Sequence, residues 1–371
     1  MDFPVDRWSS VVSRMREVAD AFRLPDVPRR YVTVRKIVNF WRCQFAWLLA
    51  SDRVGGRPYE LVLEMTNACN LRCPHCPTGR GRFGRRPTLM DMAQLERVVD
   101  ELAPYAFTAD LHNWGEPMLH GKLTDAIRLL EEKGVRTTVC TNFNVPFDAA
   151  KAEALVRSGL SVLGVSIDGP DQATYETYRV RGRLTQVLKN ASLVVAAKRR
   201  LGSDTPRVIW TYLLFRHNER RLGDARRLAT RLGFDFEVTR GLVPDDPTWE
   251  TTKPVHHPAF DLFGKGRSCR FLYSMAAVNA DLGVSPCCSD AAFESVDDFG
   301  TVRDGSFRAV WNGTRHRAAR RLFRALDRRG TAGNERVCCE RCSIYTLRRD
   351  AALRSGRPRA GGRSSTQSTS P

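Results

Sequence analysis

The sequence has no long hydrophobic run. Its most apolar stretch, residues 45–50, is far shorter than the roughly 20 apolar residues that a membrane-spanning helix needs. The N-terminal segment, MDFPVDRWSS, also lacks the basic region and the apolar core of a secretory signal. No long internal repeat is visible. We therefore expect no transmembrane segment and a cytoplasmic location.

Acidic residues are outnumbered by basic ones. The 371 residues include 59 Lys and Arg against 41 Asp and Glu, a formal charge of +18. Such an excess suits an anionic substrate, a nucleic acid or a membrane surface. Several of the arginines, however, lie in a segment after Tyr345 that ends GGRSSTQSTSP. We expect residues 346–371 to be a disordered basic tail, and we do not expect a nucleic-acid partner.

Residues 1–57 are predicted to be a helical N-terminal extension. Apolar residues recur at helical spacing and mark one face, formed by Val34, Val38, Trp41, Phe45 and Leu48. Such a face can contact a membrane or a partner, but more often it packs on the main domain, which is the arrangement that we expect here.

Strand and helix patterns alternate over residues 58–240. The predicted strands are 59–65, 108–112, 136–141, 161–167, 207–214 and 234–238, and the predicted helices are 89–102 (capped by Thr88), 123–133, 149–158, 184–200 and 219–232. Such alternation favours an α/β fold of parallel strands, either an open sheet or a partial barrel. A linker at 241–265 then leads to a cysteine-rich module at 266–345, which a metal is expected to hold together.

Three of the eleven cysteines lie on one short loop after the first strand. Cys69, Cys73 and Cys76 have the spacing C-x3-C-x2-C. Three thiolates can hold three irons of a cubane cluster and leave the fourth iron open to a small ligand. A zinc site completed by His75 is the alternative, but His75 directly precedes Cys76, which makes joint ligation awkward.

The loop resembles the signature of the radical S-adenosylmethionine (radical SAM) superfamily. This resemblance implies a partial (β/α)6 TIM-like barrel and a [4Fe-4S] cluster whose open iron chelates S-adenosylmethionine. It also implies reductive cleavage to a 5′-deoxyadenosyl radical, which abstracts a substrate hydrogen, and an electron donor of the flavodoxin or ferredoxin type.

Further segments resemble cofactor-binding motifs of the same family. Trp114-Gly115-Glu116-Pro117 resembles its G-G-E-P motif, so Glu116, with the backbone of Gly115 and Pro117, would bind the methionine ammonium. Asn142 lies where relatives show T-N-G, and Phe143 replaces the glycine. Ser166 and Asp168 belong to an S-x-D-G segment and would contact the cofactor, although Asp168 could instead only cap the turn. Arg179 or Arg181 would face the methionine carboxylate, and Arg179 is our choice.

A second cysteine set lies in the last third of the chain. Cys269, Cys287, Cys339 and Cys342 can supply four thiolates to a second, fully ligated [4Fe-4S] cluster. Cys288 and Cys338 are adjacent duplicates, and we expect one of each pair to reach the metal. The region resembles the SPASM domain and its shorter twitch form, which implies one auxiliary cluster. A four-cysteine zinc module is the alternative.

The resemblance implies cofactor and mechanism more strongly than substrate. We expect an oxidoreductase that oxidises, epimerises or dehydrates a hydroxylated small molecule such as a sugar or an aminocyclitol. A peptide maturase is the second reading, and an electron carrier or RNA-binding module the third. His112, Asn113 and Glu176 are candidates for a catalytic base, among which the sequence does not choose. Cys43 and Cys140 are expected to be buried core residues.

Overall fold

A computed structural model describes residues 23–81, 84–241, 246–254, 268–324 and 335–355. The strands in these ranges form one nine-stranded sheet with the order β6-β5-β4-β3-β2-β1-β7-β8-β9. Strands β1 to β7 run parallel to one another, and β8 and β9 pair antiparallel. The bounds are β1 (Glu60–Leu63), β2 (Thr108–Asp110), β3 (Arg136–Thr141), β4 (Val162–Ser166), β5 (Arg207–Leu214), β6 (Asp235–Arg240), β7 (Met275–Val278), β8 (Gly283–Ser285) and β9 (Gly300–Thr301).

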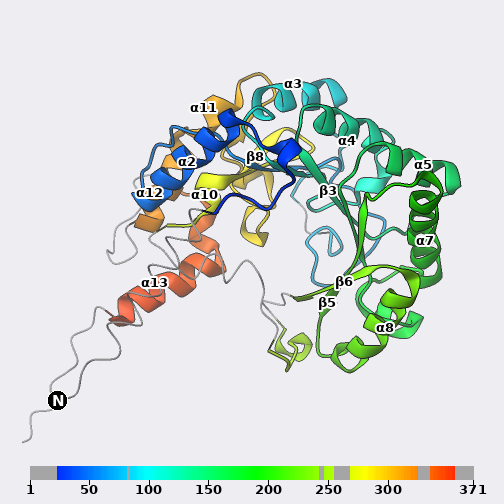
Figure 1. Ribbon diagram of the computed structural model, residues 1–371. Coiled ribbons are helices and arrows are strands. Elements are labelled where there is room, and N and C mark those ends of the chain that lie inside the picture. The colour runs from blue at the N-terminus through cyan, green and yellow to red at the C-terminus, as the bar shows by residue number, and fades with distance from the viewer. Residues whose placement is uncertain (1–22, 82–83, 242–245, 255–267, 325–334, 356–371) are drawn as a thin grey trace, which may run out of the picture.

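Helices cover the outer side of the curved sheet. Figure 1 shows α3, α4, α5, α7 and α8 in a row along this side, the arrangement that alternating strands and helices predict. The α/β expectation is confirmed, and the strands curve as part of a barrel. The helix bounds are α2 (Val34–Leu48), α3 (Met92–Leu102), α4 (Leu123–Glu132), α5 (Ala149–Arg157), α6 (Gln172–Tyr178), α7 (Leu184–Leu201), α8 (Leu222–Leu232), α10 (Phe271–Ser274), α11 (Phe307–Trp311), α12 (Thr314–Arg324) and α13 (Ser343–Ser355).

Local sequence signals set several of the helix ends. Gly202 and Gly233 end α7 and α8 in the left-handed conformation, with φ of 61° and 76°. Asp91 caps α3 by accepting a hydrogen bond from Gln94 N. The prediction that Thr88 caps this helix is therefore wrong. The N–H of Thr88 instead donates to Asn67 Oδ1 at 2.7 Å, because the chain here runs beside the segment that follows β1.

The cysteine-rich module continues the main sheet. Strand β7 pairs with β1 in parallel, with Met275 opposite Glu60, and β8 and β9 extend the sheet beyond it. One continuous sheet therefore spans the predicted boundary between residues 58–240 and residues 266–345. Most of the predicted linker lies outside the described residues, and its described part includes the short 3-10 helix η4 (Pro247–Trp249). The C-terminal cysteines are thus carried by strands and loops fixed to the edge of β1.

Helix α2 packs on the main domain as expected, and Trp41 and Leu48 of the predicted face lie partly buried against the core. Its Gln44 side chain donates to the hydroxyl of Tyr59 at 2.9 Å, and Trp47 Nε1 donates to Ser268 O at 3.0 Å. Val34, on the predicted apolar face, is 78% exposed, and Val38 and Phe45 are also exposed. The apolar pattern marked only part of the buried face, because that face also carries polar side chains held by hydrogen bonds: Asn39 Oδ1 accepts from Arg57 N at 2.7 Å.

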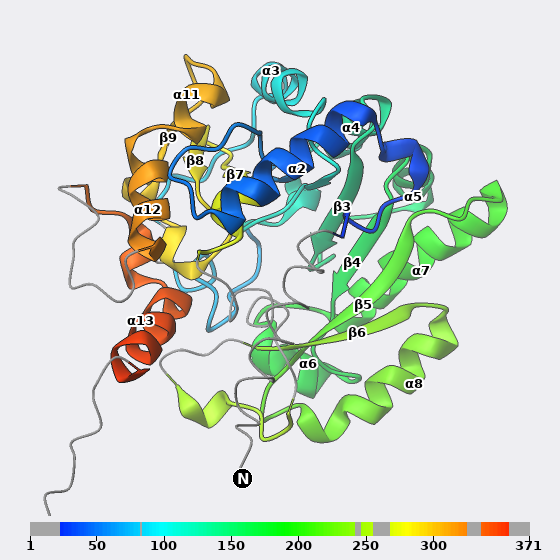
Figure 2. The ribbon, with the colours of Figure 1, turned by 60° about the vertical axis from the view of Figure 1, so that its left-hand side comes forward.

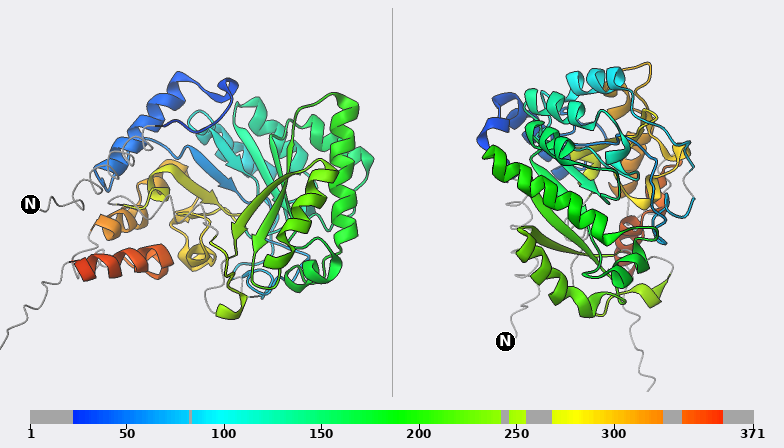
Figure 3. Two further views of the ribbon diagram at one scale, coloured as in Figure 1. Left: turned by 60° about the horizontal axis from the view of Figure 1, so that its bottom comes forward. Right: turned by 90° about the vertical axis from the view of Figure 1, so that its right-hand side faces the viewer.

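The segment after Tyr345 begins as a helix. Helix α13 spans Ser343–Ser355, so the prediction of disorder from residue 346 is wrong for its first ten residues, and 356–371 lie outside the described residues. Figures 2 and 3 show α12 and α13 at the end of the molecule away from α7 and α8. None of the helices in the described ranges has the length and apolarity that a bilayer crossing needs.

Candidate functional site

The first three cysteines lie on the loop that follows β1. Cys76 N donates to Cys73 O at 3.2 Å, which folds the loop back on itself. Two N–H donors approach the sulfurs: Asn142 Nδ2 lies 3.6 Å from Cys69 Sγ, and Arg179 Nη1 lies 3.9 Å from Cys73 Sγ. Such donors stabilise thiolates, so the loop suits sulfur atoms that carry negative charge.

Burial acts against these thiolates in the absence of a metal. It raises the pKa of Cys73 to about 11, although the charge of Arg179 acts in the opposite direction. Burial also raises the pKa of Cys69. Because a ligating cysteine must lose its proton, cluster binding releases protons and is favoured at higher pH.

The loop suits a cluster better than a single ion. A single zinc ion needs every ligating sulfur at about 2.3 Å from the same metal. In a cubane cluster each cysteine sulfur binds a different iron, so the sulfurs can lie farther apart. His75, the suggested fourth zinc ligand, instead packs its ring edge-on against Trp249, with centroids 4.8 Å apart.

The segment after β2 holds Glu116 in a buried position. Its Oε1 accepts from Thr141 Oγ1 at 2.6 Å and from Met118 N at 3.0 Å, and its Oε2 accepts from Asn142 N at 2.7 Å. A Cβ on Gly115 would lie 1.9 Å from the carbonyl oxygen of Thr66, so only glycine fits here. Since a carboxylate oxygen can accept more than one bond, Oε2 can still receive an ammonium.

The turn after β3 keeps its shape although Phe143 replaces glycine. Phe143 has φ of 55°, the left-handed region that favours glycine. Its ring is fully buried and lies edge-on against Phe147, with centroids 4.8 Å apart. Packing therefore offsets the strain, and Asn142 stays directed at Cys69.

Arg179 forms a buried ion pair with Asp168. Arg179 Nε donates to Asp168 Oδ2 at 2.6 Å, and Leu213 N donates to Asp168 Oδ1 at 2.7 Å. Arg181 is exposed, which favours Arg179 as the arginine of the site. Arg179 follows α6, a helix that the sequence did not predict. Ser166 ends β4 and is partly exposed.

The later cysteines gather at the other end of β1. Electrostatic neighbours of Cys339 include Cys338, Cys287 and Cys269, and those of Cys269 include Cys342. Burial, together with this mutual repulsion, raises the pKa of Cys269 to about 11. The four predicted ligands are therefore neighbours. Cys338 is buried beside them, whereas Cys288 is exposed and lies within electrostatic reach of Asp110.

A polar group lines the inner face of the sheet between the two cysteine sets. The N–H of Cys140 donates to His112 Nδ1 at 3.1 Å. A Cβ on Gly164 would lie 2.7 Å from Cys140 Sγ, so this thiol points along the inner face towards β4. The expectation that Cys140 is core is wrong, because it is only partly buried. Cys43 is buried as expected.

Sequence reasoning named His112 but missed Asp110, the last residue of β2, which lies two residues earlier and so points to the same side of the extended chain. Glu176, another candidate base, is exposed and accepts a hydrogen bond from Gln172. It takes no part in this group. Strand alternation was the signal that could have found Asp110.

Comparison with known families agrees with this geometry. Residues 63–228 match the model described as "Radical SAM superfamily", and residues 269–343 match that of an iron–sulfur cluster-binding domain, SPASM. The chain belongs to the radical SAM superfamily. Like others of this family, it uses [4Fe-4S] clusters and S-adenosylmethionine, and its C-terminal module is a SPASM domain.

Curated relatives of this radical SAM protein have different activities. The GTP 3′,8-cyclase of Chlorobaculum tepidum is 27% identical over 154 residues, which are 40% of this chain and 44% of that protein. The mycofactocin maturase MftC of Mycobacterium ulcerans is 24% identical over 318 residues, 78% of this chain and 81% of that protein. The chain thus spans less than half of the cyclase.

Solved structures share the fold. Streptococcus suis SuiB bound to S-adenosylmethionine has a TM-score of 0.58 and 16% identity, over 91% of this chain and 82% of that one. At this identity the likeness concerns the fold alone, so the substrate must be argued from the site.

Proposed function

We propose that this radical SAM enzyme oxidises a hydroxylated small molecule, such as a sugar or an aminocyclitol, on the inner face of the sheet. When bound, S-adenosylmethionine and its cluster would supply the radical that removes a substrate hydrogen, and the auxiliary cluster would accept the remaining electron after the hydroxyl proton has left. The observation that carries the proposal is the polar group of Asp110, His112 and Cys140, placed between the two cysteine sets.

In the strand register, this group lies nearer the amino ends of the strands than the proposed cofactor residues, by about two residues. Cys140 pairs with Gly164 across β3 and β4. Asn142 and Ser166 are each two residues further along, about 7 Å nearer the carboxyl ends of the strands. A substrate on Cys140 and His112 would therefore lie next to the cofactor.

His112 is suited to donate a hydrogen bond. Burial disfavours its imidazolium, but Cys140 and Asp110 outweigh burial and raise the pKa of His112 to about 9. The Cys140 N–H nevertheless donates to Nδ1, and a nitrogen that accepts carries no proton. Nε2 therefore carries a proton, and it can donate to a hydroxyl oxygen.

Asp110 is suited to accept the hydroxyl proton. Burial raises the pKa of Asp110, while His112 and the hydroxyl of Thr138 act in the opposite direction. A carboxylate whose pKa is raised is a stronger base. His112 would donate to the hydroxyl oxygen of the substrate, and Asp110 would accept the hydroxyl proton. This pairing favours an alcohol over an apolar substrate.

The proposed ligands follow from the site. We propose Cys69, Cys73 and Cys76 for the cofactor-binding cluster, Glu116, Asn142, Ser166, Asp168 and Arg179 around the cofactor, and Cys269, Cys287, Cys339 and Cys342 for the auxiliary cluster. An acidic electron donor of the flavodoxin or ferredoxin type would complement the charge of +18.

A peptide maturase is the second candidate. It is favoured by the mycofactocin maturase, whose similarity covers 78% of this chain. Modification of a peptide side chain would use the same inner face, with the peptide entering at the carboxyl ends of the strands.

The experiment that tests the proposal follows deuterium. The reconstituted, reduced enzyme is incubated with hexoses and aminocyclitols deuterated at their carbinol carbons, and 5′-deoxyadenosine is analysed by mass spectrometry. The proposal predicts deuterium transfer from at least one of these alcohols together with a ketone product. Transfer from none of them, but from a deuterated peptide encoded beside the gene, would establish the maturase instead.

A further inference from the structure

The proposed cofactor segment, residues 113–117, touches the SPASM domain, called the auxiliary module below, directly. Glu64, which directly follows β1, is fully buried and accepts two backbone hydrogen bonds. Its Oε1 accepts from Trp114 N at 3.0 Å, in the segment that carries Glu116, and its Oε2 accepts from Ala280 N at 3.2 Å, in the β7–β8 hairpin. One carboxylate therefore joins the two segments.

The side chains of the cofactor segment make two more contacts with the module. Trp114 lies edge-on against Phe293, with ring centroids 6.1 Å apart. Asn113 Nδ2 donates to Asn279 Oδ1 at 3.4 Å. Trp114 stands where the resembling motif has glycine, so the aromatic contact depends on a residue by which this chain departs from that motif.

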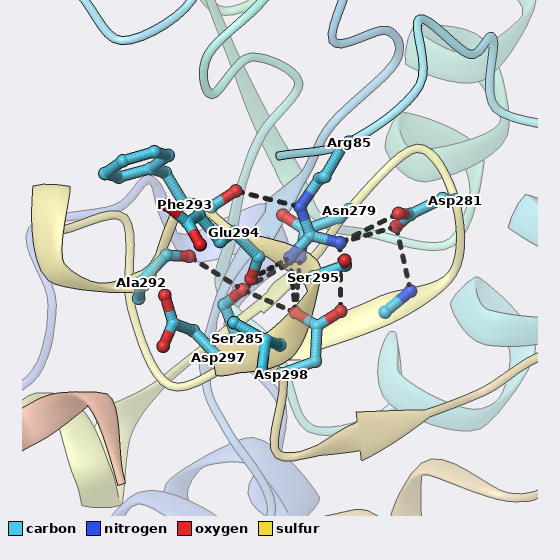
Figure 4. A network of polar contacts seen from close by, with 12 residues as sticks. Arg85, Asn279, Asp281, Ser285, Ala292, Phe293, Glu294, Ser295, Asp297 and Asp298 are labelled. Carbon is cyan, nitrogen blue, oxygen red and sulfur yellow. Dashed lines mark hydrogen bonds and ion pairs between the residues drawn. The ribbon is translucent and has the colours of Figure 1, made fainter. Parts of the chain in front are cut away.

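The hairpin that receives these contacts is itself held rigidly. Figure 4 shows the guanidinium of Arg85 between the carboxylates of Asp281 and Asp298, at 2.8 and 2.5 Å, and its side chain also donates to the carbonyl oxygens of Phe293 and Glu294. Arg85 is buried, and it follows the first cysteine loop in the chain. Charge-assisted bonds of this kind fix orientation as well as adding stability.

The same hairpin positions an auxiliary cysteine. Strand β8 ends at Ser285, two residues before Cys287. Ser285 Oγ accepts from Asn279 Nδ2 at 2.8 Å and donates to Asp298 Oδ1 at 3.1 Å. A displacement of Cys287 would therefore shift Asn279 and Ala280, and through them the cofactor segment.

We propose that Glu64 and Trp114 are positioning residues that couple the two cluster sites, so that a filled auxiliary site strengthens the binding of S-adenosylmethionine. Coupling between sites is reciprocal, so bound S-adenosylmethionine must equally favour the filled auxiliary site. The proposal concerns the cofactor and is independent of the substrate proposed above.

The test compares cofactor affinity with and without the auxiliary cluster. The double variant Cys287→Ala/Cys342→Ala removes two proposed ligands of that cluster while leaving the first cysteine loop intact. The dissociation constant of S-adenosylmethionine is measured by anaerobic equilibrium dialysis in the wild-type and the Glu64→Gln backgrounds. We expect the ligand removal to weaken binding by about 5-fold or more in the wild type, the lower end of typical couplings. In Glu64→Gln the same removal should change the constant by less than about 2-fold.

Glu60→Gln is the matched control. Glu60 begins β1, four residues before Glu64 and on the same face, and it accepts a hydrogen bond from Ser274 Oγ at 3.1 Å. Within the described residues its side chain makes no hydrogen bond to the cofactor segment. It should retain the full coupling. Equal dissociation constants with and without the auxiliary ligands in the wild-type background, or full coupling in Glu64→Gln, would overturn the proposal.

A second measurement covers the case in which a variant fails to fold. In the intact holoenzyme, S-adenosylmethionine should shift the reduction potential of the auxiliary cluster. Trp114→Gly, which restores the glycine of the motif, should diminish that shift. An unchanged potential on binding S-adenosylmethionine to the wild type would contradict the coupling, as would a full shift in Trp114→Gly.

Discussion

Replacing Asp168 by asparagine should strongly destabilise the protein, because it leaves Arg179 buried without a counter-charge. The side chain of Asp168 is completely buried and that of Arg179 is 13% exposed. Asparagine has nearly the same shape, and its oxygen can still accept from Leu213 N, the second partner of Asp168. The change therefore keeps the size of the side chain but removes its charge and the oxygen that accepts from Arg179.

The magnitude follows from the burial of the pair. Breaking a buried ion pair by removing one partner costs about 3–5 kcal/mol, since the remaining charge stays desolvated. The apo-protein should show most of this cost. Replacing both residues, in Asp168→Asn/Arg179→Met, removes the unpaired charge, so the double variant should be more stable than Asp168→Asn alone.

The assay is urea unfolding of the reduced apo-protein, followed by circular dichroism, for both single variants and the double variant. A cost below about 1 kcal/mol for Asp168→Asn would show that solvent reaches the pair and would refute the reasoning. So would a double variant whose loss equals the sum of the single losses, because coupled partners are not additive.

Three further predictions concern pH, shape and chemistry. Burial lowers the pKa of Lys36 from 10.5 to about 8, so the unfolded chain binds more protons between these values; stability should rise with pH across that window in the wild type and stay flatter in Lys36→Met. Gly115→Ala should weaken S-adenosylmethionine binding by about 1–3 kcal/mol in equilibrium dialysis, whereas Gly121→Ala, where a Cβ meets nothing within 4 Å, should not. Asp110→Asn should slow product formation by about 100-fold or more while deuterium still reaches 5′-deoxyadenosine, and an unchanged rate of product formation would exclude Asp110 as the base.

Local patterns predicted the parts of the fold that local physics decides. The bounds predicted for β3 and β5 agree with the structure, because β-rich segments there lie between clear breaks, such as Gly134 with φ of 70° before β3. The pairing of β7 with β1 was not predicted. It joins residues more than 200 positions apart, and no local signal records such a partner.

The candidate site likewise has a part that the sequence predicts and a part that it does not. The cysteine loop and the Gly115-Glu116 segment have sequence spacings that express their geometry, so they could be predicted. The neighbours of Cys140 could not, because they depend on the register between β2, β3 and β4. The links from Glu64 to Trp114 and Ala280 likewise appear only after the chain has folded.

The central claim is that Cys69, Cys73 and Cys76 hold a cluster with one open iron that binds S-adenosylmethionine. The most direct measurement combines Mössbauer spectroscopy of anaerobically reconstituted, ⁵⁷Fe-labelled protein with an assay for 5′-deoxyadenosine. The wild type should hold two [4Fe-4S] clusters, one of which changes its spectrum when S-adenosylmethionine is added. The triple alanine variant of these cysteines should hold only the other cluster and form no 5′-deoxyadenosine. A triple variant that still cleaves S-adenosylmethionine would contradict the account.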